Sequence, residues 1–294
     1  MVRGVWKKAG SVGVLVAFLM ANGRNGRSAI RPPTAHEVEI VGRDYAFTAP
    51  RELPAGETTF RFTNSGKVIH ELDVALLKGS TTAQSVMSAL NAKTPLKPLI
   101  ERSVGILIAR PGRRSSVGLA TELLEGRDYL VICRFQDSAS APMHSRMGMI
   151  SVIHVTPGRT AVPRSVGVDT IVGIDYAYRA PRTLGAGSHT FTFVNAGTVD
   201  HEVNIALLRS GATLEQVFTI AKANGDLNSL VAEWLGVLVA RPGTRALGEL
   251  HAKLLPGREY AIMCELTDND KSPSHLTLGM FGSIRTTKAI RANR

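Results

Sequence analysis

Cysteine and aromatic residues are scarce in this chain of 294 residues. The two cysteines, Cys133 and Cys264, allow at most one disulfide, which excludes a disulfide-rich scaffold. Aromatic residues make up 5% of the sequence, whereas glycine and proline are plentiful, which suits short strands joined by many turns. The GxSxG, HExxH and P-loop motifs are also absent, so no hydrolase or nucleotide-binding enzyme of those classes is indicated.

Long apolar runs are confined to the N-terminus. Residues Ser11–Ala21 (SVGVLVAFLMA) follow a positively charged start and are too few to span a bilayer. This pattern predicts a signal peptide within residues 1–29, cleaved at Ala21-Asn22-Gly23 or near Ser28-Ala29. We therefore expect an exported protein, periplasmic or secreted, whose mature chain has no transmembrane segment.

Acidic residues are outnumbered, which gives a formal net charge of +11. The basic residues are scattered, and no lysine- and arginine-rich run is interleaved with aromatic residues, so a nucleic-acid partner is not expected. The charge is compatible with an acidic partner protein or, more simply, with a solvated basic surface.

The chain contains two copies of one pattern, related by a constant offset of 131 residues, as Cys133 and Cys264 show (264 minus 133). Two copies are too few for a solenoid, so they predict two tandem domains of one fold. We expect domains at residues 36–156 and 168–288, joined by a linker at 157–167. The shared residues include Asp44-Tyr45 with Asp175-Tyr176, Asn64 and Gly66 with Asn195 and Gly197, and Asp137 and Pro142 with Asp268 and Pro273.

Short segments with the two-residue period of half-buried strands fill each copy. One segment of the first copy, Thr81–Ala92, instead predicts a short amphipathic helix capped by Thr81 or Thr82. The pattern therefore predicts an all-β sandwich or Greek-key barrel with one inserted helix per domain. Strands are expected at 38–48, 58–63, 68–77, 106–109, 116–123, 128–135 and 147–155.

Soft and intermediate metal donors recur at the same offset in both copies. A thiolate with two imidazoles and a weak thioether is the donor set of a blue-copper electron-transfer site. Because Met147 aligns with Leu278, Met149 is the better methionine candidate. The alternatives for the cysteines are one disulfide or two separate metal roles. The candidate metal ligands are His70, Cys133, His144 and Met149, and His201, Cys264, His275 and Met280.

The order of these residues resembles the cupredoxins, the plastocyanin and azurin family of small blue-copper proteins. An Asn-x-Gly turn precedes the first histidine, the cysteine ends a later strand, and the second histidine and the methionine follow on the next loop. The resemblance covers most of both copies. It implies a Greek-key β-sandwich that holds copper at one end, up to one ion per domain, and electron transfer with an unknown redox partner.

Two features depart from the family pattern. The loop from cysteine to histidine, C-x3-D-x4-P-x-H in both copies, is longer than in plastocyanin or azurin. Glu71 and Glu202 follow the first histidines, where plastocyanin and azurin carry asparagine. A carboxylate here would raise the electron density at the metal and favour its oxidised form, or would hydrogen-bond the histidine.

The remaining histidines argue against an enzyme. Arg134 and Glu265, not histidine, follow the two cysteines, so the His-Cys-His segment of multicopper oxidases is missing. None of the other four histidines is shared between the copies: His36, His154, His189 and His251. The leading hypothesis is therefore an exported tandem cupredoxin that carries electrons or copper and is not an enzyme. The alternative is a metal-free cupredoxin-like binding or scaffolding module of the cell envelope.

Overall fold

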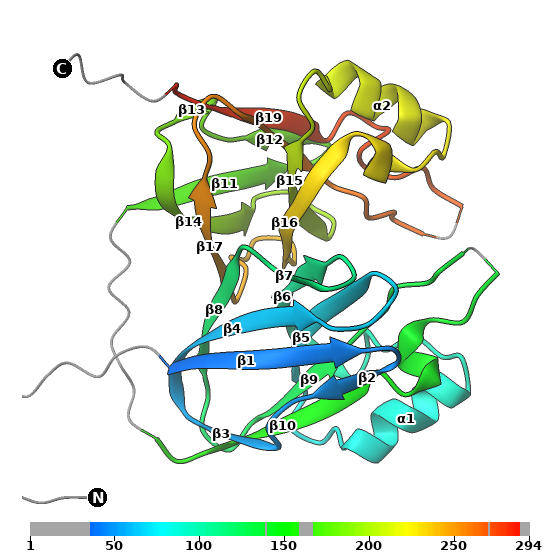
Figure 1. Cartoon of the computed structure of the whole chain (residues 1–294). Helices are drawn as coiled ribbons and strands as arrows, with labels where there is room; N and C mark the ends of the chain where they lie inside the picture. The colour runs from blue at the N-terminus through cyan, green and yellow to red at the C-terminus, as the bar shows by residue number, and fades with distance from the viewer. Residues whose placement is uncertain (1–35, 139, 159–166, 270, 289–294) are drawn as a thin grey trace, which may run out of the picture. The chain divides into compact units, whose positions relative to one another are not determined.

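Strands dominate both copies, as the alternating pattern predicts (Figure 1). The computed structural model describes residues 36–138, 140–158, 167–269 and 271–288. The predicted signal peptide and residues 159–166 of the predicted linker lie outside the described residues. No helix in these described ranges is long and apolar enough to cross a membrane.

The first copy forms two layers of strands. One layer has the order β2-β1-β4-β8, with β7 also paired to β4, and the other has the order β3-β10-β9-β5-β6. Its elements are β1 (His36–Arg43), β2 (Ala46–Thr48), β3 (Glu52–Pro54), β4 (Gly56–Asn64), β5 (His70–Leu77), α1 (Ala83–Asn91), β6 (Ile100–Ala109), β7 (Arg113–Arg114), β8 (Gly118–Leu123), β9 (Asp128–Ile132), a 3-10 turn (His144–Met147) and β10 (Ile150–Thr156).

The second copy repeats this arrangement, with the orders β12-β11-β14-β17 and β13-β19-β18-β15-β16. Its elements are β11 (Val168–Ile174), β12 (Ala177–Arg179), β13 (Thr183–Leu184), β14 (Gly187–Asn195), β15 (His201–Leu208), α2 (Leu214–Lys222), a 3-10 turn (Leu227–Ser229), β16 (Val231–Ala240), β17 (Glu249–Leu254), β18 (Glu259–Met263) and β19 (Phe281–Thr286). In both copies the first strand pairs in parallel with the fourth, β1 with β4 and β11 with β14.

The core lies between the two layers. Phe60 and Phe62 of β4 pack in one cluster with Leu72 and Val74 of β5, and all four are fully buried. Complete burial of one such side chain contributes about 1.5–3 kcal/mol. These contacts hold β5, whose first residue is His70, firmly in place.

The helices cover the outer face of one layer. Val86 and Leu90 of α1 pack in a cluster with Leu77 of β5 and Ile132 of β9. The Thr82 hydroxyl accepts a hydrogen bond from the Ser85 N–H and caps the helix, as predicted. The buried outer face explains why β5 reads as a nearly continuous apolar run rather than a strict alternation.

The fold class predicted from the sequence is confirmed: an all-β sandwich with a short helix in each copy. The segment Val38–Thr48, expected to be one strand, is instead a hairpin of β1 and β2 that turns at Asp44-Tyr45. In addition, β6 begins at Ile100, six residues before the expected start, because it continues past a bulge in its pairing with β5.

Pairing between strands also continues from one copy to the other. Residues 118–120 of β8 pair with β17, and Ile106 of β6 pairs with Val237 of β16. The division into domains at 36–156 and 168–288 stays a prediction.

Candidate metal centre

The first histidine and the cysteine come from neighbouring strands. His70 opens β5, and Cys133 directly follows β9, which pairs with β5 through Asp73 and Ile132. The Glu71 N–H donates to Cys133 Sγ over 3.3 Å, so the backbone of β5 holds the sulfur. The side chains of His70 and Cys133 are both fully buried.

The long loop after the cysteine folds back to it. The His144 N–H donates to the Phe135 carbonyl over 3.0 Å, and the Ser145 N–H donates to the Cys133 carbonyl over 2.8 Å. These bonds close the loop and return the second histidine to the sulfur. The length of the loop therefore does not displace His144 from the site.

Three donor atoms meet at one point in the first copy. His144 Nδ1 lies 3.5 Å from Cys133 Sγ, His70 Nδ1 lies 3.9 Å from it, and the two nitrogens are 3.0 Å apart. All three side chains are fully buried and form one of the two groups able to hold a metal ion among the described residues.

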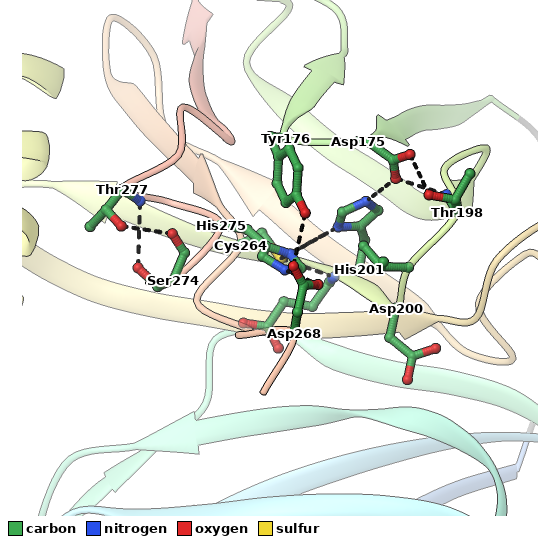
Figure 2. Close-up of polar contacts among 12 residues, drawn as sticks. Asp175, Tyr176, Thr198, Asp200, His201, Cys264, Asp268, Ser274, His275 and Thr277 are labelled. Carbon is green, nitrogen blue, oxygen red and sulfur yellow. Dashed lines mark hydrogen bonds and ion pairs between the residues drawn. The ribbon is translucent and has the colours of Figure 1, made fainter. Parts of the chain in front are cut away.

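The second copy builds the same arrangement from β15, β18 and the loop after β18 (Figure 2). His275 Nδ1 lies 3.3 Å from Cys264 Sγ, His201 Nδ1 lies 4.0 Å from it, and the nitrogens are 3.1 Å apart. The cysteines are both free thiols within separate sites, so the disulfide alternative does not apply. One thiol and two imidazoles suit copper, which confirms the predicted cofactor at the level of the donor set.

The methionines lie next to these groups along the chain. The Cys133 N–H donates to the Met149 carbonyl over 3.1 Å, and the Met149 N–H donates to the His144 carbonyl over 3.0 Å. Met149 is fully buried, with its methyl group against Gly42, and Met280 lies equivalently against Gly173. Their role as fourth ligands stays a prediction.

An aspartate lies at the Nε2 atom of each of the four site histidines, and the sequence did not predict these contacts. His70 Nε2 lies 3.4 Å from Asp44 Oδ1, and His144 Nε2 lies 3.2 Å from Asp137 Oδ1. In the second copy the partners are Asp175 and Asp268, both at 3.0 Å (Figure 2). A carboxylate at Nε2 fixes the tautomer that donates there and leaves the Nδ1 lone pair facing the sulfur.

Hydrogen bonds and burial set the charges around the site. Burial raises the pKa of the Cys133 and Cys264 thiols to about 12. Hydrogen bonds from the hydroxyl and backbone N–H of Thr198 lower the pKa of Asp175 to about 2, so this carboxylate is charged. In the metal-free protein the cysteine thiols are therefore protonated, and Asp175 is ionised behind the His201 imidazole.

Glu71 and Glu202 do not take the position predicted for them. Among the described residues, neither carboxylate hydrogen-bonds a histidine of the sites; instead both backbone N–H groups donate to the cysteine sulfurs. Burial raises the pKa of both carboxyl groups to about 7.

Solved blue-copper proteins match the single copies in a comparison of structures. No protein-family profile and no curated protein matches the sequence. An auracyanin from Roseiflexus castenholzii is 20% identical, with a TM-score of 0.29, over 42% of this chain and 98% of its own. An azurin from Methylomonas sp. strain J is 16% identical, with a TM-score of 0.28, over 42% of this chain and 100% of its own. The resemblance to this family predicted from the sequence is confirmed as a likeness of structure.

Oxidases match over both copies, which corrects one prediction. A blue copper oxidase from Nitrosomonas europaea is 14% identical, with a TM-score of 0.24, and the match covers 86% of this chain and 86% of its own. The prediction that the chain is not an enzyme is contradicted by this finding. That prediction rested on the absence of a His-Cys-His segment, of further histidines shared between the copies and of common enzyme motifs, and such absences do not exclude enzymatic activity as a whole.

Proposed function

We propose that the chain binds one copper ion in each copy and transfers electrons or carries copper outside the cytoplasm. His70, Cys133 and His144 would hold one ion, and His201, Cys264 and His275 the other. Met149 and Met280 would be the weak axial ligands. Bound copper would supply a one-electron redox couple.

The observation that carries this proposal is the convergence of the Nδ1 atoms. With Nε2–H donating to aspartate, both Nδ1 atoms present lone pairs to each other at 3.0 Å and to the sulfur. Two buried lone pairs at this distance repel unless a proton or a metal ion lies between them, and the cysteine sulfur beside them adds the soft third donor that suits a metal ion. The arrangement therefore favours a metal site over the alternative of a metal-free scaffolding module.

The protein residues would keep the site rigid while the electron moves. Backbone hydrogen bonds fix the sulfur, carboxylates orient both imidazoles, and burial excludes water. A site whose ligands are already arranged needs little movement on a change of oxidation state, which suits repeated electron transfer.

The test is the colour and stoichiometry of the copper-loaded chain. We expect intense visible thiolate-to-copper absorption and up to two copper ions per chain, with the absorption about halved in each of Cys133→Ser and Cys264→Ser. Met147→Leu, which introduces the residue of the second copy at an exposed position, should change neither quantity. A colourless loaded protein whose cysteine variants bind copper as well as the wild type would overturn the proposal.

Three further measurements test for oxidase activity, for cleavage of the signal peptide and for a redox partner. Oxygen uptake in the presence of a one-electron donor distinguishes an electron carrier from an oxidase. N-terminal sequencing of the exported protein tests cleavage within residues 1–29. Cross-linking in a lysate of the producing cell tests for the acidic redox partner.

A further inference from the structure

No metal-ligating side chain of the two sites reaches solvent. His70, Cys133, His144 and Met149 are each 0% exposed, and in the second copy the most exposed of the four equivalents, His275, reaches 1%. An external redox partner therefore cannot touch a ligand, and the electron must pass through another group.

A tyrosine ring lies against both histidines of each site. The Tyr45 ring centroid is 5.0 Å from that of His144 and 6.4 Å from that of His70, both edge-on. Tyr176 takes the same place at 5.1 Å from His275 and 6.2 Å from His201 (Figure 2). Both tyrosines are partly exposed, so each ring spans the distance between solvent and the buried imidazoles.

The aspartate of the loop ties each tyrosine to a histidine. The Tyr176 hydroxyl donates to Asp268 Oδ2 over 2.8 Å, while Asp268 Oδ1 accepts from His275 Nε2 over 3.0 Å. Tyr45 and Asp137 repeat this bridge at 3.3 Å and 3.2 Å. One carboxylate thus fixes both rings relative to each other.

The backbone is strained at both tyrosines. Tyr45 has φ of 66° and Tyr176 has φ of 60°, in the left-handed region where glycine or asparagine is more readily accommodated. Both copies nevertheless carry tyrosine at this two-residue turn. Strain of this kind persists where the side chain has a role that outweighs it.

We propose that Tyr45 and Tyr176 close the imidazole edges to water and form the path by which electrons enter and leave the two sites. The inference rests on the proposed electron-transfer function. In the oxidation step, one electron leaves the reduced site and an external one-electron oxidant gains it. No bond forms or breaks, and the phenol keeps its proton.

The second copy provides the cleaner test. In the first copy Phe135 also contacts His144, at 5.7 Å, whereas Leu266 occupies the equivalent position in the second copy. Among the aromatic ring contacts of the described residues, Tyr176 alone joins a tyrosine, phenylalanine or tryptophan ring to His275. Two variants separate the roles of the tyrosine: Tyr176→Asn removes the ring but suits a left-handed backbone, and Tyr176→Phe keeps the ring without the hydroxyl.

The first measurement uses metal-free protein and diethyl pyrocarbonate, which modifies accessible imidazoles, read out by peptide mass spectrometry. In the wild type we expect His275 to react at least about tenfold more slowly than His154, whose side chain is 52% exposed. Tyr176→Asn should bring His275 close to the rate of His154, and Tyr176→Phe should leave it protected. Equal reactivity of the two histidines in the wild type contradicts closure by the tyrosine.

The second measurement uses copper-loaded Cys133→Ser protein, in which only the second site can be blue. Electron exchange is followed with anionic ferricyanide and with cationic hexaammineruthenium(III), so that changes of surface charge are separated from loss of the ring. Tyr176→Asn should slow exchange with both reagents by about tenfold, and Tyr176→Phe should retain most of the rate.

The outcomes are distinguishable. Unchanged or faster exchange in Tyr176→Asn, with wild-type absorption, shows that the ring is not the path and overturns this inference alone. Failure of the Cys133→Ser chain to acquire a blue copper site overturns the proposed function, and the electron path fails with it.

Discussion

At the scale of single residues, an aspartate supports each histidine proposed as a metal ligand. They orient the imidazoles and keep the Nδ1 lone pairs available, a role that typically changes metal affinity by about 10–100-fold. We expect Asp268→Asn to weaken copper binding at the second site by this factor, measured by competition with a chelator. Asp128→Asn, which alters a surface aspartate paired with His154 at 2.8 Å, is the matched control and should leave the affinity unchanged.

The protonated cysteine thiols should make the proposed copper uptake dependent on pH. With a pKa of about 12, each thiol holds its proton at neutral pH in the metal-free protein, and the thiolate is the form that binds metal. Loading both sites should therefore release about two protons per chain, measured by titration in weak buffer. Cys133→Ser should release about one fewer. Equal release from wild type and variant would contradict thiolate ligation at Cys133.

Sequence analysis predicted the two histidines and the cysteine that converge in each copy because metal-donor residues recur at one offset. It did not identify Asp44 and Asp137 as their supports, although both are shared between the copies. Asp44 reaches His70 only because the chain turns at Asp44-Tyr45, and that turn lies within a segment rich in β-branched and aromatic residues that predicts a continuous strand.

At the scale of elements, the Asn-x-Gly turn before β5 leaves no room for a side chain. A Cβ at Gly66 would lie 2.3 Å from Asp44 Oδ1 and 2.9 Å from His70 Nε2. Gly66→Ala should therefore separate the aspartate from the histidine, weaken copper binding at the first site and destabilise the fold by about 1–3 kcal/mol. Chelator competition and thermal unfolding measure the two effects.

Gly79→Ala is the control for this substitution. No atom lies within 4 Å of the position that a Cβ would take at Gly79, so the added methyl group makes no close contact. Stability and copper affinity should stay near those of the wild type. A similar loss in both variants would show that the turn at Gly66 has no special relation to the site.

Element boundaries were predicted less well than element types. The helix and its Thr82 cap follow directly from the sequence, since both the apolar face and the cap are local signals. The return of the loop from Gln136 to Met143 is not local, because it depends on backbone bonds from His144 and Ser145 to Phe135 and Cys133. Spacing alone therefore left the position of His144 open.

At the scale of the whole molecule, the positive charge should govern encounters with small ions. Residues 1–29 carry five basic and no acidic residues, so the chain from residue 30 keeps a formal charge of +6. Exchange with ferricyanide should slow as ionic strength rises, and exchange with hexaammineruthenium(III) should accelerate, because salt screens attraction and repulsion alike. The opposite trend would show that the aspartates beside Tyr45 and Tyr176 dominate the local field.

The preset positions of the donor atoms have a consequence for metal identity. Buried cysteine and histidine donors also suit zinc, which is colourless and has no redox chemistry. Intrinsic affinity favours Cu(II) over Zn(II), but a site that is already assembled accepts the ion that reaches it first. If the two sites bind copper as proposed, their filling would depend on which metal is available during folding, and a zinc-filled chain would be folded but unable to transfer electrons.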